Sequence, residues 1–379
     1  MKNKPEWSTG VITIVITIVF FAVFAIPMGL ANALNTMMNT AYSLLIDTCF
    51  YIMAIAVIAG AFGSVMSEFG VVDILNRILS VFMKPLFGLP GAAALGIVTT
   101  YLSDNPAILA LAKDKKFISF FKEYQVPALT NLGTSFGMGL MVTTFMLGLG
   151  SMTGLSMGKA VLCGNLGAIF GCVVSTRLMI HHTKKTIGTE QEALLSLEEL
   201  GDDDDENVQK QSVGLRLMNA LLDGGKAGVD LGMGIIPAVL VICTIIMMLT
   251  KGAPAGGYTG DAYEGIALFP AIAEKLNFIL QPLFGFSSPE CISVPITAMG
   301  STGATFAIIR DLINSKLAYG SDIAVFTAIC MCWSGYLSTH VSMMQALHHS
   351  EMSGKSILYH TIGGLCAGVF AHYLYIFLI

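Results

Sequence analysis

Long apolar runs alternate with short polar segments along most of this chain. An α-helix rises about 1.5 Å per residue, so about 20 apolar residues are needed to cross the hydrocarbon core of a bilayer. The stretches that reach this length, and that are predicted to be full crossings, are 11–33, 42–66, 126–148, 155–178, 231–250, 323–345 and 357–378. The pattern predicts an all-α polytopic membrane protein with about seven full transmembrane helices.

Two other apolar stretches, 89–117 and 286–316, are broken near their middle by turn residues. The first contains Ser-Asp-Asn-Pro at 103–106 and the second contains Gly-Ser-Thr-Gly at 300–303. Proline disfavours helical geometry in the residue before it, and glycine relaxes that geometry. Each arm has roughly 12 residues, which reach about halfway through a bilayer. We therefore expect two re-entrant helical hairpins with these motifs at their tips.

A helix with a polar face precedes each hairpin. Polar residues recur at helical spacing through Glu68–Lys84, and the segment 266–281 has a similar mixed character, which predicts amphipathic interfacial helices. Residues 84–88 (Lys-Pro-Leu-Phe-Gly) match residues 281–285 (Gln-Pro-Leu-Phe-Gly) at an offset of 197. The same offset superposes the two hairpin tips, so the chain contains an internal repeat.

Each repeat has three crossings. Because three is an odd number, the two copies are predicted to insert in opposite orientations, and such inverted repeats are typical of secondary transporters. When the N-terminus is placed inside, the cytoplasmic segments hold 15 of the 20 Lys and Arg residues, as the positive-inside rule requires. We expect a multi-pass protein of the bacterial cytoplasmic (inner) membrane, with a cytoplasmic N-terminus and an external C-terminus.

Four parts follow from this layout. They are an N-terminal transmembrane helix and connection at 1–41, a first repeat at 42–179, a cytoplasmic acidic linker at 180–226 and a second repeat at 227–379. The linker contains five consecutive acidic residues at 202–206, and such a run is typical of a solvated, flexible segment.

Composition excludes several classes of protein. Hydrophobic residues make up 54% of the chain and charged residues 12%, whereas soluble domains carry about 25% charged residues. The net charge is −5 and no basic stripe is present, so nucleic acid is not an expected partner. The eight cysteines lie in apolar segments without metal-binding spacing and are expected to be small buried hydrophobes. No nucleotide-binding loop, nucleophile elbow or zinc-protease motif is present, which argues against an enzyme and against ATP-driven transport.

Polar residues at the hairpin tips, and in the crossings that follow them, are candidate ligands of a solute. Non-helical backbone within a membrane is tolerated where it lines a protein-walled or watery cavity, which favours the tips. Small polar residues also interrupt the next crossings, at 130–137 and 333–340. The candidate substrate-binding residues are Asp104, Asn105, Asn131, Ser135, Glu290, Ser301, Thr302 and Ser338.

A coupling ion has its own candidate residues, which are Asp104, Glu290, Asp47 and His340. Carboxylates at membrane depth commonly have a function, and histidine titrates near neutral pH. Each residue also has a structural interpretation: a tip cap for Asp104, a helix N-terminal carboxylate for Glu290, a structural carboxylate for Asp47 and a hydrogen-bonded interface residue for His340. The hydroxyl residues serve equally well for close helix packing. No cofactor or metal is expected beyond a bound sodium ion.

The motifs at 85–91 and 103–106, with their counterparts at 284–290 and 300–304, resemble the nucleoside-recognition (Gate) domain family, which includes spore maturation proteins A and B. The chain looks like a fusion of those two partners. The resemblance implies a layout similar to that of concentrative nucleoside transporters, with an interfacial helix, a re-entrant hairpin and a broken helix in each half. Those transporters carry Gln-Thr-Glu-Ala and Asn-Glu-Phe motifs, whereas this sequence has Ser-Asp-Asn-Pro at 103–106 and Thr-Asn-Leu at 130–132.

The predicted function is that of an ion-coupled secondary transporter, driven by sodium or protons. Its solute is a small polar organic compound, such as a nucleoside, a nucleobase or an amino-acid-like molecule, bound between the two hairpin tips. The expected partners are this solute, the lipid bilayer and further copies of the chain in a homo-oligomer. The alternative is a non-transporting membrane assembly or regulatory factor of the spore-maturation type.

Overall fold

The computed structural model describes residues 7–104, 107–112, 115–153, 156–193 and 212–378, and these residues form helices without any strand. In chain order the elements are α1 (Trp7–Met28), α2 (Leu30–Ser43), η1 (Leu44–Cys49), α3 (Phe50–Glu68), α4 (Val71–Phe82), η2 (Met83–Phe87), α5 (Ala93–Leu102), α6 (Ala107–Ala112), α7 (Lys115–Ile118), η3 (Glu123–Gln125), α8 (Ala128–Thr134), α9 (Gly139–Gly148), α10 (Gly150–Thr153), α11 (Gly158–Thr186), α12 (Val213–Ala238), η5 (Val239–Cys243), α13 (Thr244–Thr250), α14 (Leu268–Phe284), η6 (Pro289–Ile292), α15 (Ser293–Gly300), α16 (Thr302–Asn314), α17 (Gly320–Trp333), α18 (Tyr336–Ala346), η7 (Ser350–Met352) and α19 (Ser353–Leu378). Elements η1, η2 and η5 are π-helical, whereas η3, η6 and η7 are 3₁₀-helical.

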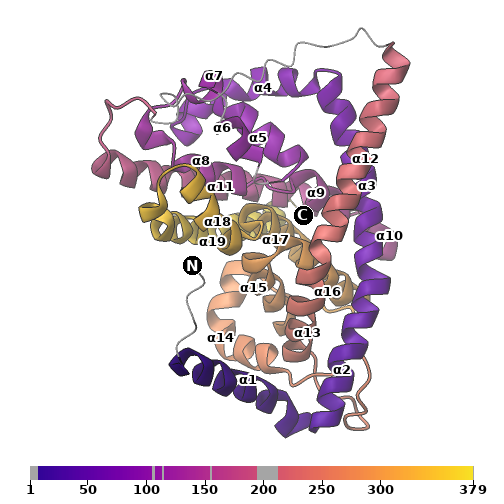
Figure 1. Cartoon of the computed structure of the whole chain (residues 1–379). Coiled ribbons are helices and arrows are strands. Elements are labelled where there is room, and N and C mark those ends of the chain that lie inside the picture. Colours follow the sequence, from indigo (N-terminus) through magenta and orange to yellow (C-terminus); the bar gives the residue numbers. More distant parts are fainter. Residues whose placement is uncertain (1–6, 105–106, 113–114, 154–155, 194–211, 379) are drawn as a thin grey trace.

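Two long helices run along one side of the molecule (Figure 1). The first joins α2, η1 and α3 over Leu30–Glu68, and the second joins α12, η5 and α13 over Val213–Thr250. Helices α3 and α12 touch backbone to backbone: a Cβ added to Gly228 would lie 2.4 Å from the carbonyl oxygen of Ala56. Glycine at such positions lets membrane helices approach closely, so small residues explain this pairing.

The amphipathic segments before the hairpins are helical, as predicted. Gly88 follows the end of η2 and Gly285 follows the end of α14, and both glycines have positive φ, +75° and +61°. The helices lie at different ends of the molecule, with α4 near the top of Figure 1 and α14 in its lower half. Their boundaries differ slightly from the prediction, because Glu68 is the last residue of α3 rather than the first of the amphipathic helix.

The same offset of 197 recurs in polar contacts. The backbone N–H of Lys122 donates to Oε1 of Gln125 over 3.0 Å, and the backbone N–H of Tyr319 donates to Oδ2 of Asp322 over 2.8 Å. A residue on the last helix of each half donates to a carbonyl at the end of the amphipathic helix: Arg177 to Pro85, and Tyr373 to Pro282 over 2.5 Å. The two prolines are 197 positions apart, and the two donors are 196 apart. Matching contacts in both halves support the repeat that the sequence predicts.

Both hairpins break at the predicted tips. Helix α5 ends at Leu102 before α6 begins at Ala107, and α15 ends at Gly300 before α16 begins at Thr302. The stretches 126–148 and 323–345, predicted as full crossings with polar interruptions, are each two shorter helices. Their breaks contain Met138 and Gly335, which have φ of +56° and +69° and are again 197 positions apart. The hairpins are predicted to enter the membrane only partway and the stretches 126–148 and 323–345 to cross it, and both statements stay predictions.

Five helices are long and apolar enough to span a membrane, namely Thr9–Met28, Leu30–Glu68, Gly158–Thr186, Val213–Thr250 and Ser350–Leu378. The first ends at Met28 rather than at residue 33, because Gly29 has a φ of +80° that interrupts the helix. The predicted linker 180–226 is too long: α11 continues to Thr186, and α12 begins at Val213. Helices therefore extend into both ends of the predicted linker, and its acidic run lies outside the described residues.

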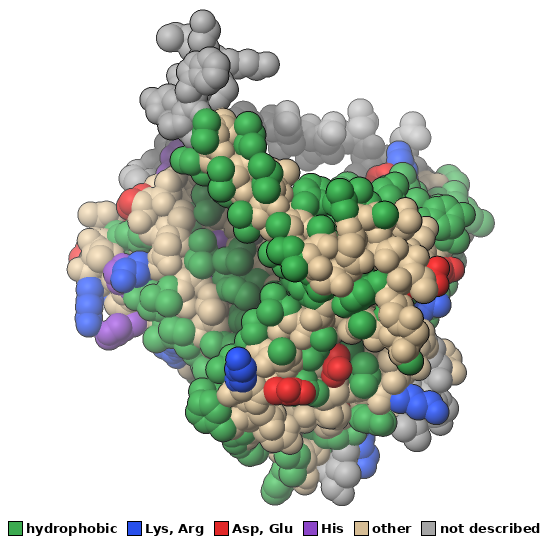
Figure 2. Space-filling view, turned by 90° about the horizontal axis from the view of Figure 1, so that it is seen from below, with side chains coloured by type: hydrophobic (Ala, Val, Ile, Leu, Met, Phe, Trp, Pro, Cys, Tyr) green, Lys and Arg blue, Asp and Glu red, His purple; other side chains and the backbone are tan. Residues whose placement is uncertain are grey.

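The surface suits a lipid environment. Large apolar side chains on α1, including Val11, Ile14 and Ile18, are more than half exposed, and charged side chains are sparse on the face drawn in Figure 2. Lipid is the medium that covers such surfaces, since water penalises them. With this composition and these helices, the chain is a multi-pass membrane protein.

Ion pairs join segments that the topology places on the same side of the membrane. Lys122 and Glu192, both predicted to be cytoplasmic, pair with Nζ 2.5 Å from Oε1. Lys251 and Asp311, both predicted to be external, pair with Nζ 2.5 Å from Oδ2. These contacts agree with the predicted sidedness, whereas the absolute orientation stays a prediction.

Candidate functional site

A cavity of about 770 Å³ lies between the first hairpin and the paired helices α3 and α12. The hairpin contributes Ser103 and Asp104 to its lining, α3 contributes Ser64 and Ser67, and α12 contributes Asp223. Small-molecule sites commonly occupy roughly 300–1,000 Å³ with a few polar groups on a mainly apolar wall. The size and lining of this cavity match that description.

Two carboxylates reach the cavity from different walls. Asp104 is half-buried where α5 gives way to α6, and Asp223 is exposed on α12. None of the described residues that line the cavity is Lys or Arg. Carboxylate oxygens accept hydrogen bonds and attract cations, whereas serine hydroxyls donate and accept. The lining therefore suits a solute rich in donor groups, such as hydroxyls or amines.

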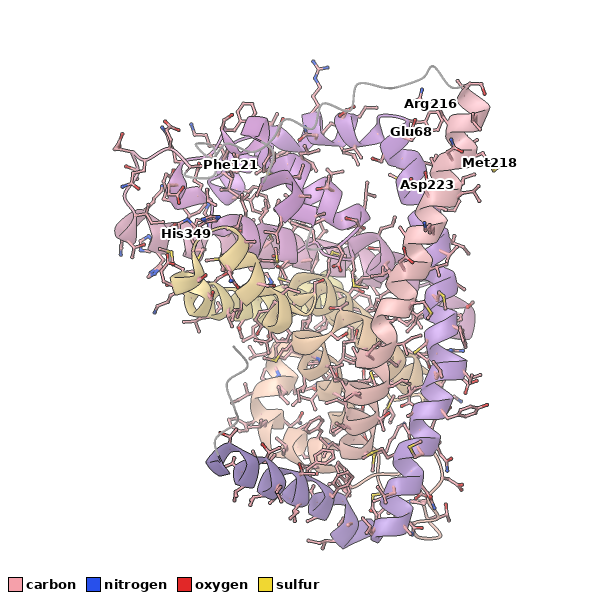
Figure 3. All side chains as sticks on the ribbon, viewed as in Figure 1. Glu68, Phe121, Arg216, Met218, Asp223 and His349 are labelled. Carbon is pink, nitrogen blue, oxygen red and sulfur yellow. The ribbon has the colours of Figure 1, made fainter. Side chains whose placement is uncertain are left out.

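An ion pair stands beside this cavity, at the end of α3 and the start of α12. Arg216 Nε lies 2.6 Å from Glu68 Oε1, and a second guanidinium nitrogen donates to the backbone oxygen of Glu68 over 3.2 Å. Figure 3 shows this pair at the same end of the two helices as Asp223, which follows Arg216 by seven positions, about two turns of α12. The pair holds together the two helices that form one wall of the cavity.

The second hairpin tip is closely packed and does not line this cavity. Thr302 Oγ1 donates to the carbonyl of Cys330 over 2.8 Å, and Ser301 Oγ accepts from the backbone N–H of Ala304 as a helix N-cap. The backbone N–H of Gly335 donates to the carbonyl of Ala298 over 3.0 Å. These contacts dock the tip onto α17 and α18. The predicted solute position between both tips is therefore not the position of this cavity.

Asn131 and His340, two predicted site residues, are brought together in a buried network away from the cavity lining. Asn131 Nδ2 donates to the carbonyl of Ser356 over 3.2 Å, and Ser356 Oγ donates back to Asn131 Oδ1 over 2.9 Å. Ser356 Oγ also lies 3.0 Å from His340 Nδ1. Ser135, one turn after Asn131, donates to the Asn131 carbonyl over 2.8 Å. The network joins α8 of the first repeat to α18 and α19 of the second.

The remaining predicted residues lie elsewhere. Asp47 is exposed in η1, where it accepts a hydrogen bond from Ser43 over 2.9 Å and its carbonyl accepts from Arg310. Glu290 is half-buried in η6, one position after Pro289, as expected for a carboxylate at a helix N-terminus. Asn105 lies outside the described residues. The backbone of Ser338 belongs to α18, but its side chain lies outside the described part of the chain.

Sequence reasoning missed Asp223, Ser356 and His360. Asp223 was assigned to the acidic linker, although the glycines at 224, 228 and 232 follow it at helical spacing. That spacing could have identified a packed helix. Ser356 and His360 lie in an ordinary apolar crossing, and no local sequence signal distinguishes them.

The backbone is similar to solved structures of CNTnw, a concentrative nucleoside transporter. An outward-facing state of a doubly substituted variant matches with a TM-score of 0.53 and 13% identity, covering 98% of this chain and 86% of that chain. An inward-facing, substrate-bound state matches with a TM-score of 0.53 and 13% identity, covering 99% and 87%. A substituted variant in an intermediate state matches with a TM-score of 0.54 and 13% identity, covering 98% and 93%.

Comparison of the sequence with protein-family models finds no match, and comparison with curated proteins finds none either. The resemblance to Gate domains and to spore maturation proteins is therefore not confirmed, whereas the transporter-like layout is supported by the structural neighbours. At this level of identity the comparison shows that the chain has the fold of these transporter structures.

Proposed function

We propose that this chain is a secondary transporter of a small polar organic solute, such as a nucleoside, a nucleobase or an amino-acid-like compound. The observation that carries the proposal is the cavity between the first hairpin and helices α3 and α12, with Asp104 and Asp223 in its walls. The fold adds support, because its structural neighbours are transporter structures in outward-facing, intermediate and inward-facing states.

The position of the cavity suits alternating access. One wall belongs to the pair α3 and α12, which is held rigidly by backbone contact at Gly228. The other wall is the hairpin, whose helices α5 and α6 are short and separated by a break at the tip. Movement of the hairpin-bearing helices along α3 and α12 would expose the solute to either side, as in transporters that move one bundle against another.

An ion gradient is the proposed energy source. The sequence contains no nucleotide-binding loop, and either sodium or protons can drive such transporters. Carboxylates at the cavity would bind a cation or hold the donor groups of the solute.

Uptake into proteoliposomes tests the proposal. A panel of labelled nucleosides, nucleobases and amino acids is offered with a sodium or pH gradient to the wild type, to Asp104→Asn and to Asp223→Asn. A hydrogen bond to a charged group contributes about 1.5–3 kcal/mol, so we expect each variant to lose roughly tenfold to hundredfold in apparent affinity.

The matched control is Asp230→Asn. Asp230 is exposed on the same helix, seven positions after Asp223, and does not line the cavity. Its uptake should equal that of the wild type. Equal uptake by all three variants would exclude the cavity as the solute site, and the absence of any accumulated solute would exclude the transport function.

A further inference from the structure

Two histidines lie side by side in the interior where α18 and α19 meet. His340 and His360 are fully buried, and their ring centroids are 4.5 Å apart. Tyr336 packs against both rings, with centroids 5.6 Å from His340 and 5.3 Å from His360. Buried histidines in a transmembrane bundle require an explanation, because hydrocarbon penalises polar groups.

The hydrogen bonds assign the neutral tautomer of each ring. Ser356 Oγ donates to Asn131 Oδ1, so it accepts from His340, whose Nδ1 carries the hydrogen. His360 Nε2 lies 2.6 Å from the carbonyl oxygen of Cys332, which only accepts, so Nε2 carries the hydrogen of that ring. The other nitrogen of each ring, His340 Nε2 and His360 Nδ1, is then a bare lone pair.

Neither lone pair has a partner. Both atoms are buried without any hydrogen bond in the described part of the chain, and so is the indole N–H of Trp333, whose ring packs on Tyr336 at 5.8 Å. Unpaired buried polar atoms are rare in proteins and indicate a water, an ion or a catalytic or redox role. Two lone pairs in adjacent rings bind a cation or accept a hydrogen bond from a donor group.

We propose that His340 and His360 together form the proton-binding site of this transporter, so that the coupling ion is a proton. The inference rests on the proposed transport function. One proton binds to either lone pair, and the neighbouring neutral ring and its hydrogen bonds stabilise the charge. A second proton is excluded, because two cations in adjacent buried rings would repel each other strongly.

No charged side chain is among the contacts of the pair in the part of the chain that the structure describes. Among the described contacts of the pair, the titratable side chain is Tyr336, on α18. The contact from α17 is the backbone carbonyl of Cys332, and Ser356 on α19 and Asn131 on α8 contribute neutral groups. Glu351, in η7 just before α19, pairs with His349 instead. Among these described contacts, the two imidazoles are therefore the bases available to a proton.

The location links proton binding to movement. His340 lies on α18, which follows the break at Ser334–Gly335, and the network through Ser356 extends to Asn131 on α8 of the other repeat. A charge on the pair changes the contact between the two halves at a helix that is already interrupted. When a helix has two stable arrangements, an ion that binds one arrangement more tightly shifts the protein toward it. Proton binding at this pair would in this way drive the change between inward-facing and outward-facing states.

Proteoliposome assays of His340→Asn and His360→Gln test the inference. These replacements keep an N–H donor near the nitrogen that is hydrogen-bonded and replace the basic ring nitrogen by an amide oxygen that does not take up a proton in this pH range. We expect accumulation driven by a pH gradient to fall at least tenfold, while counterflow of unlabelled against labelled solute continues. His181→Gln is the control, because His181 is exposed on α11 outside this site, and it should retain both activities. Accumulation by the His340 and His360 variants at the wild-type level, or by the wild type with a sodium gradient alone, would overturn the inference.

A second measurement does not depend on transport. In histidine-labelled wild-type protein in detergent, nitrogen NMR should show one buried ring, and not two, taking a proton as the pH is lowered stepwise from 8 to the lowest value at which the protein stays folded. If neither buried ring titrates, the proton site is wrong even when solute is transported. If counterflow is absent but one ring titrates, the transport function fails while the proton site stands.

Discussion

Cys332 Sγ lies 3.8 Å from Ser135 Oγ in the fully buried centre of the protein, and the two residues are 197 positions apart. This is the offset that relates the two sequence repeats, so a residue of one half meets its own counterpart in the other. In a twofold arrangement this happens at the axis. The Cys332–Ser135 contact therefore places an approximate twofold axis between the repeats.

The last helices of the two repeats, α11 and α19, also meet backbone to backbone. A Cβ added to Gly171 on α11 would lie 2.4 Å from the carbonyl of Gly363 on α19, and a Cβ added to Gly363 would lie 2.7 Å from the carbonyl of Gly171. The two equivalent helices thus cross in backbone contact. This contact makes the centre of the protein rigid beside the hairpins.

Close packing of α3 on α12 predicts opposite effects for two neighbouring glycines. At Gly228 a Cβ would lie 2.4 Å from a backbone oxygen, so Gly228→Ala should destabilise the protein by about 1–3 kcal/mol. At Gly225 the nearest atom is 3.7 Å away, so Gly225→Ala should be neutral or stabilising by up to about 1 kcal/mol through helix propensity. Thermal unfolding in detergent measures both, and equal effects would contradict the observed packing.

An ion pair near the start of α19 predicts a pH dependence of stability. His349 Nε2 lies 2.8 Å from Glu123 Oε1, and both side chains are buried. Burial alone would lower the pKa of His349, but the hydrogen bonds and negative charges of Glu123 and Glu351 outweigh it and raise that pKa. The stabilisation is therefore complete below the unfolded pKa of about 6.5 and is lost as the pH rises through the higher folded value.

The expected difference in unfolding free energy between wild type and His349→Gln is about 1–3 kcal/mol at pH 5.5, and it should shrink toward pH 8.5. Melting temperatures at a series of pH values measure this difference. His181→Gln, at an exposed position, is the control and should show no such trend. A difference that grows with pH would show that the charged pair is not formed.

The buried carboxylate Glu264 predicts the reverse dependence. Burial acts to raise the pKa of Glu264, but hydrogen bonds from Thr259 Oγ1 (2.6 Å) and from the backbone N–H groups of Thr259 and Gly260 (both 3.0 Å) outweigh burial and lower it. Its stabilisation is present above the unfolded pKa of about 4.3 and is lost as the pH falls through the lower folded value.

Glu264→Gln should therefore destabilise the protein by about 1–3 kcal/mol at neutral pH, because an amide cannot accept all of these hydrogen bonds. The difference from the wild type should shrink as the pH falls toward 3, within the range where the protein remains folded. Asp261→Asn, at an exposed carboxylate of the same loop, should have a smaller effect. Chemical denaturation at pH 7 and at the lowest tolerated pH measures both variants.

Sidedness is testable with single added cysteines. Glu190→Cys lies in the segment predicted to be cytoplasmic, and Asp261→Cys in a loop predicted to be external; both positions are exposed. A membrane-impermeant maleimide applied to intact cells should label Asp261→Cys, and should label Glu190→Cys only after lysis. The native cysteines in the spans give little background where they are buried. Labelling of both positions from outside would refute the predicted topology.

The sequence by itself determined the local architecture. The apolar runs, the breaks at 103–106 and 300–303, and the repeat offset all follow from short-range chemistry: helix length, the geometry around proline and glycine, and the spacing of polar residues. Glycine and hydroxyl residues likewise indicate the interruptions near Met138 and Gly335, where the backbone has positive φ.

Only the tertiary structure decided which helices meet. It placed Asp223 on a packed helix beside the first hairpin, docked the second tip away from that cavity, and set His340 against His360. The physical reason is that lipid is as apolar as a leucine side chain, so hydrophobic patterning does not select partners among membrane helices. Partner choice depends instead on close backbone approach at small residues and on buried hydrogen bonds between distant segments, which the local sequence pattern does not encode.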